Sequence, residues 1–290
     1  MQSNLFTAVL LPLALAVVML GMGLSLVPED FRRITRHPKA VALGTACQIV
    51  GLPLLGALIT TVVPMQPEIA VGLMILAICP GGPSSNLVTC LARGDVALSV
   101  TLTAVSSVIT VFTIPIFANL ALQHFLGESA AIALPIGSTI LQIFLITLLP
   151  IALGMAIRWQ VPETAKRLEK QMSRLAAGLL ALIIVLLLAK EGNKLPGFLA
   201  QVGVGALLLN VLAALGGFVA GKVFHLPLAQ QICIAIEVGI QNGTLAIAIT
   251  AGLLNNADMA IPAAIYSLLM YVTGFGAILY GRKATANSAR

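Results

Sequence analysis

Apolar stretches of about twenty residues follow one another along almost the whole chain, with short polar breaks between them. Of the 290 residues, 59% are apolar and only 9% are charged, whereas about a quarter of a soluble domain is charged. The charged residues gather in the breaks instead of covering a surface. Because about 20 apolar residues form a helix that crosses the hydrocarbon of a membrane, the pattern predicts an all-α polytopic membrane protein and excludes an ordinary soluble enzyme.

Nine crossings are predicted when the chain is divided at its polar breaks. The spans are residues 4–27, 38–63, 68–91, 95–122, 130–158, 172–190, 198–222, 228–253 and 259–281. Fourteen of the sixteen Lys and Arg residues fall in the loops of one side, and the other side holds only Lys190 and Lys194. Since basic loops stay in the cytoplasm, we expect the N-terminus outside and the C-terminus inside. One crossing more or fewer would remove this asymmetry.

The cysteines and the net charge indicate no other class of protein. The four cysteines lie in apolar stretches: Cys47, Cys79, Cys90 and Cys233. None belongs to a CxxC pair, so they are predicted to be packing thiols and not disulfides or zinc ligands. The net charge of +6 comes from residues at span ends, so no nucleic-acid partner is expected. A cleaved signal peptide is the alternative for the first span, but no basic residues precede it and no small-residue cleavage site follows it.

Two of the predicted spans contain residues that do not suit an uninterrupted membrane helix. Residues 79–86 read CPGGPSSN, and residues 237–244 read EVGIQNGT. Proline removes a backbone donor and glycine loosens the helix, so each span is expected to break here. Unpaired backbone groups are costly in hydrocarbon, and such breaks persist where protein, water, an ion or a substrate satisfies them. The breaks therefore predict a ligand site, with ordinary helix kinks as the alternative.

The two breaks lie at matching positions of two halves. The third and the eighth span each follow two plain spans and precede one more. Because the eighth span comes five positions after the third, an odd number, the two broken helices run in opposite directions, as in transporters with inverted repeats. The first half has four spans and the second has five, which fits a 5+5 repeat that lacks its first helix.

Glu237 is the one ionisable side chain deep within a predicted span, which makes it a candidate functional residue. Every Lys and Arg belongs to a loop or a span end, so a cation from solution is its expected partner. Hydroxyl and amide side chains near the breaks offer hard oxygen ligands for Na⁺; they are Gln48, Ser85, Asn86, Ser99, Thr103 and Gln241. Ser99 and Thr103, four residues apart, share one helix face. A proton carried by Glu237 is the alternative to Na⁺.

The second half of each broken helix also offers a place for an anion. Free amides and the positive end of the helix dipole are expected near residues 83–84 and 242–243. A small carboxylate could bind between them, with apolar surroundings for its organic part. An organic anion is therefore favoured over a sugar or a cation.

At these residues the sequence resembles the bile acid:sodium symporter family. Its bacterial members carry a CPGG-x-x-SN break, an LARG-x-VALS-V continuation and an E-x-G-x-QN break, which stand here at residues 79–86, 91–100 and 237–242. Residues 21–24 and 36–39 resemble the family's first cytoplasmic corner, and the resemblance runs from about residue 19 to residue 275.

The resemblance implies a panel domain and a core domain, with the two discontinuous helices crossing in the core. The panel would contain residues 4–27, 130–158 and 172–190, and the core would contain residues 38–122 and 198–281. This is the family's pattern without its first helix. The expected location is a bacterial inner membrane.

The resemblance also implies two sodium sites that share Glu237. The first would use Ser85, Asn86, Ser99, Thr103 and Glu237. The second would use Gln48, Glu237, Gln241 and the carbonyls of Val238 and Ile240. Candidate substrate residues are Pro83, Ser84, Asn242 and Gly243. Pro83 stands where several members of the family have a hydroxyl residue, and Met270-Tyr271 stands where they have a more polar pair. The resemblance is therefore weaker for the substrate residues than for the sodium ligands.

Together these features predict a secondary active transporter that imports a small organic anion with Na⁺ by alternating access. The resemblance implies a pantoate-like monocarboxylate or a bile-acid-like substrate. A proton-coupled or efflux carrier of the same architecture is the first alternative. A membrane sensor or a membrane-embedded enzyme is the second, although the spans contain no paired carboxylates and no metal-ligand cluster. Membrane lipid surrounds the chain, and no protein partner is predicted.

Overall fold

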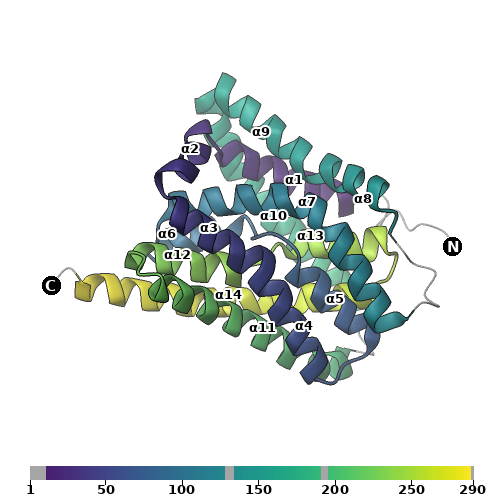
Figure 1. Ribbon diagram of the computed structural model, residues 1–290. Helices are drawn as coiled ribbons and strands as arrows, with labels where there is room; N and C mark the ends of the chain where they lie inside the picture. The colour runs from purple at the N-terminus through teal and green to yellow at the C-terminus, as the bar shows by residue number, and fades with distance from the viewer. Residues whose placement is uncertain (1–10, 128–133, 191–194, 289–290) are drawn as a thin grey trace.

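The computed structural model describes residues 11–127, 134–190 and 195–288, and within them the regular structure is helical (Figure 1). The first half contains α1 (Leu11–Ser25), α2 (Pro28–Arg36), α3 (Pro38–Ala46), the π-helical η2 (Cys47–Gly51), α4 (Leu52–Val62), α5 (Pro67–Ala77), α6 (Ser84–Leu91) and α7 (Val96–Leu126). The second half contains α8 (Ile136–Ile143), the π-helical η3 (Phe144–Leu148), α9 (Leu149–Gln160), α10 (Pro162–Lys190), α11 (Leu195–Val223), α12 (Leu228–Gly239), α13 (Gly243–Ile247), the π-helical η4 (Ala248–Leu253), the 3-10 turn η5 (Asp258–Ala260) and α14 (Ile261–Ser288).

The described helices confirm a polytopic all-α membrane protein but only part of the predicted count of crossings. Five segments are long and apolar enough to cross a membrane: Pro38–Val62, Val96–Leu126, Ile136–Gln160, Val202–Val223 and Asp258–Ala286. The bent pair α1 and α2 would be a sixth. The two broken spans appear as shorter apolar helices, and residues 4–10 and 130–133 of the predicted first and fifth spans lie outside the described residues. Nine crossings therefore remain a prediction.

Prolines explain the π-helical segments of two spans. Pro53 and Pro150 lie inside continuous helices, and each is the second residue after the end of a π-helical turn, η2 and η3 respectively. A proline has no N–H for the carbonyl four residues earlier, and its ring crowds that carbonyl. Widening the preceding turn by one residue relieves both problems without ending the helix.

Two groups of helices pack closely among themselves. α1 lies against α9 and α10, whereas α11 lies against α12 and α14. A Cβ atom on Gly23 would lie 2.2 Å from the carbonyl oxygen of Ile151, and one on Gly154 would lie 2.5 Å from that of Leu20. Glycine at both positions therefore lets the backbones of α1 and α9 touch, which is a usual way to pack membrane helices.

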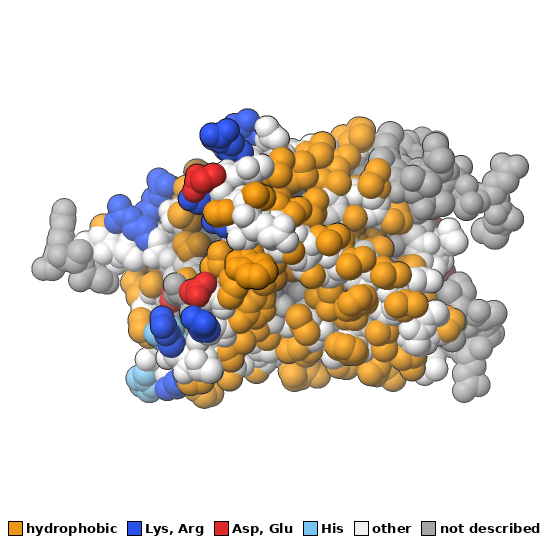
Figure 2. All heavy atoms as spheres, turned by 90° about the horizontal axis from the view of Figure 1, so that it is seen from above, with side chains coloured by type: hydrophobic (Ala, Val, Ile, Leu, Met, Phe, Trp, Pro, Cys, Tyr) orange, Lys and Arg blue, Asp and Glu red, His pale blue; other side chains and the backbone are white. Residues whose placement is uncertain are grey.

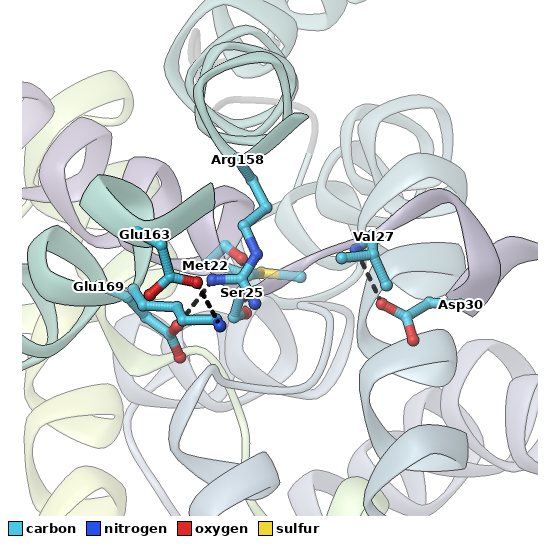
Figure 3. A network of polar contacts seen from close by, with 8 residues as sticks. Met22, Ser25, Val27, Asp30, Arg158, Glu163 and Glu169 are labelled. Carbon is cyan, nitrogen blue, oxygen red and sulfur yellow. Dashed lines mark hydrogen bonds and ion pairs between the residues drawn. The ribbon is translucent and has the colours of Figure 1, made fainter. Parts of the chain in front are cut away.

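Charged side chains concentrate toward one end of the molecule. Figure 2 shows Lys and Arg side chains near the end at which α14 finishes, and a broad hydrophobic surface beyond them. Figure 3 shows Arg158 pointing from its helix toward Met22 and Ser25 at the end of α1. The guanidinium forms an ion pair of 3.9 Å with Glu169 of α10. The arrangement agrees with the predicted gathering of basic residues on one side, while the orientation of the termini remains a prediction.

The connection after α1 is held to the long helix α7. Asp30 accepts a hydrogen bond of 2.9 Å from the backbone N–H of Val27, which caps the start of α2 (Figure 3). The backbone carbonyl of Asp30 in turn accepts a hydrogen bond of 2.8 Å from the hydroxyl of Thr101.

Near the other end of α7, the side-chain amide of Asn119 forms two hydrogen bonds with the backbone of Leu134, at 2.8 and 2.9 Å.

The cysteines agree only in part with their prediction as packing thiols. All four are free. Cys79 and Cys233 are buried and Cys47 is half-buried, but Cys90 is exposed. Its place is on α6 after the first break, where the short helix leaves one side uncovered, so burial was wrong for Cys90.

Candidate functional site

The helix breaks predicted from the two polar segments are present, and they lie against each other. α5 ends at Ala77 and α6 starts at Ser84, while α12 ends at Gly239 and α13 starts at Gly243. The N–H of Gly82 donates to the carbonyl of Ile240 at 2.9 Å. The N–H of Asn242 donates to the carbonyl of Pro80 at 3.0 Å, so that Gly81 and Gln241 form an antiparallel bridge. Each break thus supplies partners for backbone groups that the other leaves free.

Three hydroxyl groups surround the carboxylate of Glu237. The side chain is fully enclosed, with 1% of its surface exposed. Ser85 of α6 and Ser99 of α7 each donate to Oε2 at 2.7 Å, and Thr103 of α7 donates to Oε1. The i, i+4 pair on α7 therefore points at one carboxylate, as the spacing predicts.

No cationic side chain reaches this carboxylate within the described part of the chain. The ion pairs formed there join Arg32 to Glu29, Arg158 to Glu169 and Lys166 to Glu163. Among the described residues, no three His, Cys, Asp or Glu side chains lie close enough together to hold a metal ion. The donors around Glu237 are instead neutral oxygens, which are the ligands that hard cations prefer.

Gly81 leaves the space that the carboxylate occupies. A Cβ atom there would lie 2.3 Å from Oε1 of Glu237. The first break therefore places the backbone of a glycine next to the carboxylate, in addition to the hydroxyl of Ser85.

Asn86 lies next to Ser85 but makes no contact of this kind. Its Oδ1 atom is buried and has no hydrogen-bond partner. A buried carbonyl oxygen without a donor is rare, because burial removes its hydrogen bonds to water. An unsatisfied oxygen in this place fits a ligand that accepts electron pairs, such as a cation.

Gln48 and Gln241 form a second cluster between the two breaks. The Nε2 group of Gln48 donates to the carbonyl of Cys79 at 2.9 Å and to Oε1 of Gln241 at 2.8 Å. The Nε2 group of Gln241 donates to the carbonyl of Val238 at 2.6 Å. The structure thus brings Gln48, Gln241 and the Val238 carbonyl of the predicted second site together, whereas Glu237 bonds to the hydroxyls of the first set and the Ile240 carbonyl already accepts the N–H of Gly82.

The predicted substrate residues lie at the starts of the second half-helices. Pro83 and Ser84 are half-buried, and Gly243 is buried. Asn242 accepts the N–H of Leu245 at 3.0 Å and so caps α13. A cavity of about 580 Å³ is lined by residues of η2, α4, α5 and α7, but none of these four residues lines it. It is apolar and includes Pro53, Phe117 and His124.

Three buried polar residues next to the site were not singled out in the sequence. Thr89 of α6 donates to the hydroxyl of Ser99 at 3.4 Å. Asn210 and Tyr266 both donate to the carbonyl of Gly239 at 2.7 Å. The signal for Asn210 is an amide in an otherwise apolar stretch, of the same kind as that which drew attention to Gln48.

Comparisons with known proteins find relatives that are named as sodium-dependent transporters or cotransporters. A model of the Sodium Bile acid symporter family matches residues 12–198. The sodium-dependent transporter YocS of Bacillus subtilis is 30% identical over 261 residues, which are 90% of this chain and 79% of that protein. The probable chloroplastic sodium/metabolite cotransporter BASS1 of Arabidopsis thaliana is 29% identical over 261 residues, 90% of this chain and 63% of its own length. The human ileal sodium/bile acid cotransporter is 27% identical over 251 residues, 84% of this chain and 70% of its own.

Proposed function

Because the chain belongs to the Sodium Bile acid symporter family, we propose that it is a secondary active transporter that carries a small organic anion across the membrane together with Na⁺. Family membership indicates sodium-dependent transport of organic anions or metabolites. For this chain in particular, we propose the residues that bind the ions and the class of substrate.

The observation that carries the proposal is the enclosed carboxylate of Glu237. A buried charge is stable only when another charge or a full set of hydrogen bonds compensates it. Three hydroxyls donate to its two oxygens, which suits the ionised form, because a protonated carboxyl group uses one oxygen as a donor. With no cationic side chain nearby in the described residues, a bound cation is the natural partner. These facts support Na⁺ over a proton at this position.

Two sodium ions are proposed, one on either side of the shared carboxylate. The first ion would bind Ser85, Asn86, Ser99, Thr103 and Glu237. The second would bind Gln48, Glu237, Gln241 and the carbonyls of Val238 and Ile240. The unpartnered Oδ1 of Asn86 supports the first set, and the contacts between Gln48, Gln241 and Val238 support the second. A carbonyl oxygen has two lone pairs, so Ile240 can accept the N–H of Gly82 and still face an ion.

The substrate is proposed to bind near Pro83, Ser84, Asn242 and Gly243. Both pairs lie where a helix restarts, and backbone N–H groups at such places favour a carboxylate. A pantoate-like monocarboxylate or a bile-acid-like anion is the expected class. Alternating access would move a core of residues 38–122 and 198–281 against a panel of the remaining spans. The close packing of α1 with α9 and α10, apart from that of α11 with α12 and α14, supports this division.

The location and orientation are proposals as well. A bacterial inner membrane, with the N-terminus outside and the C-terminus in the cytoplasm, fits the one-sided distribution of Lys and Arg residues.

The test is a comparison of NaCl with choline chloride at equal concentration and fixed pH. We expect the melting temperature of the purified protein to rise only with NaCl, and to rise further when a panel of small carboxylates including pantoate contains the substrate. Uptake into proteoliposomes should stop when external Na⁺ is replaced by choline. A carboxylate effect that depends on pH and not on Na⁺ would contradict the proposal and favour a proton-coupled carrier.

Separate ion sites make a further prediction. Thr103→Val should weaken the first sodium site about tenfold or more, because the variant lacks a ligand oxygen, and should leave the second nearly unchanged. Gln48→Ala should do the reverse. The measurement is the sodium concentration dependence of the melting temperature, with choline keeping the ionic strength constant. Ser106→Ala is the matched control, because this buried hydroxyl of α7 donates only to the carbonyl of Thr103. Two separate sites should give two phases in this sodium titration, one for each ion. If either variant weakened both phases equally, this would argue against two separate sites.

A further inference from the structure

The carbonyl of Gly239 is held from two sides at the point where α12 ends. The Nδ2 group of Asn210, from the middle of α11, donates to it at 2.7 Å. The hydroxyl of Tyr266, from α14, donates to it at the same distance. Both side chains are buried, and they come from two different helices that flank the break. A buried carbonyl needs only one hydrogen-bond donor to be satisfied, and this carbonyl has two.

The carbonyls on either side of Gly239 have other partners. That of Val238 accepts the amide of Gln241, and that of Ile240 accepts the N–H of Gly82. The carbonyls of Val238 and Ile240 thus accept hydrogen bonds from residues of the two breaks, while the carbonyl of Gly239 accepts them from α11 and α14. The Gly239 carbonyl belongs to the planar peptide group between Gly239 and Ile240, and this group shares one Cα atom with the peptide group of the Val238 carbonyl and the other with that of the Ile240 carbonyl. A displacement of the middle group is therefore passed on to the groups on both sides.

We propose that Asn210 and Tyr266 are positioning residues for the second sodium site. By fixing the Gly239 carbonyl on the side of α11 and α14, they orient the peptide groups on which the Val238 and Ile240 carbonyls lie. Neither side chain touches the ion. This inference rests on the proposed function, because it assumes that Val238 and Ile240 bind sodium.

An alternative role for the two residues is general stabilisation of the fold. An amide in an apolar membrane helix needs a partner, and Asn210 has one for its NH₂ group, although its Oδ1 atom has none. Stabilisation alone would lower the melting temperature equally with and without sodium. A positioning role must instead change the sodium affinity of one site and spare the other.

The test is a sodium titration of the melting temperature for Tyr266→Phe and Asn210→Ser, again with choline as the replacement ion. Tyr266→Phe keeps the ring and removes one hydrogen bond to Gly239, so it is the variant most certain to fold. For each variant we expect the sodium concentration at half saturation of the second phase, the one that Gln48→Ala affects, to rise about fivefold to tenfold. The first phase, the one that Thr103→Val affects, should stay within about twofold.

Thr273→Val is the matched control, because it removes a hydroxyl of α14 that bonds only to carbonyls of its own helix. Unchanged half-saturation values for both phases in both variants would overturn the positioning role while leaving the proposed function intact. A wild-type protein that shows no sodium-specific stabilisation would overturn the proposed function and this inference together. Proteoliposome uptake provides a second readout, in which Tyr266→Phe should need about fivefold to tenfold more sodium for half-maximal rate.

Discussion

Glu237→Gln is expected to lower sodium-dependent uptake by about two orders of magnitude or more while the protein still folds. The amide has nearly the size of the carboxylate, and its oxygen can still accept hydroxyl donors such as Ser85 and Ser99. It cannot compensate the charge of an ion in either proposed site. Removing one partner of a buried charge pair costs about 3–5 kcal/mol, which corresponds to a factor of more than a hundred in affinity.

The measurement for this variant is uptake in proteoliposomes together with the melting temperature in NaCl and in choline chloride. The sodium-specific rise in melting temperature should vanish, and the value in choline should stay close to that of the wild type. Glu68→Gln is the control, because it removes a carboxylate from the first turn of α5, at the end of this helix opposite to the first break. Wild-type uptake by Glu237→Gln would show that the shared-carboxylate arrangement is wrong.

Gly81→Ala is expected to disable the site by crowding. The added Cβ atom would lie 2.3 Å from Oε1 of Glu237, well inside van der Waals contact, so the carboxylate or the break must move by about 1 Å. A displacement of this size can reduce the rate about a hundredfold when ligand geometry matters. The φ angle of Gly81 is not positive, so an alanine is strained here by lack of space and not by its backbone conformation.

Two variants separate crowding from a general loss of stability. Gly276→Ala should behave as the wild type, because no heavy atom lies within 4 Å of the position its Cβ would take. Gly81→Ala combined with Glu237→Asp should recover part of the sodium-dependent stabilisation, because the shorter carboxylate leaves room for the methyl group. Full uptake by Gly81→Ala alone would show that transport does not depend on the present position of the Glu237 carboxylate.

Much of the fold could be predicted because it depends on local properties of the chain. Apolar stretches separated by polar residues define helices of membrane-spanning length, and proline and glycine act on the backbone within a turn of where they stand. Both helix breaks were therefore located from residues 79–86 and 237–244 alone. The count of nine crossings goes beyond the described helices, in which five or six segments meet the length and composition of a span.

The candidate cation ligands could be named in part for the same reason. A single carboxylate in an apolar span stands out in the sequence, and so do Ser99 and Thr103 at helical spacing. The prediction treated Asn86 like Ser85, yet only Ser85 reaches Glu237, and the Oδ1 of Asn86 is left without a donor. Neighbouring residues of a helix point about 100° apart, so Ser85 and Asn86 of α6 face different surroundings.

The amino-acid sequence was sufficient to predict the apolar helices, the two places where helices break and the buried carboxylate. Those features depend on hydrophobicity and backbone chemistry over a few neighbouring residues. Which groups contact one another became known only from the packing of the helices: Ser85 and Glu237 are 152 residues apart, and Asn210 and Tyr266 both bind the Gly239 carbonyl from separate helices. Such contacts depend on how helices pack, and many packings satisfy the same apolar pattern, because lipid and the interior of the protein are almost equally apolar.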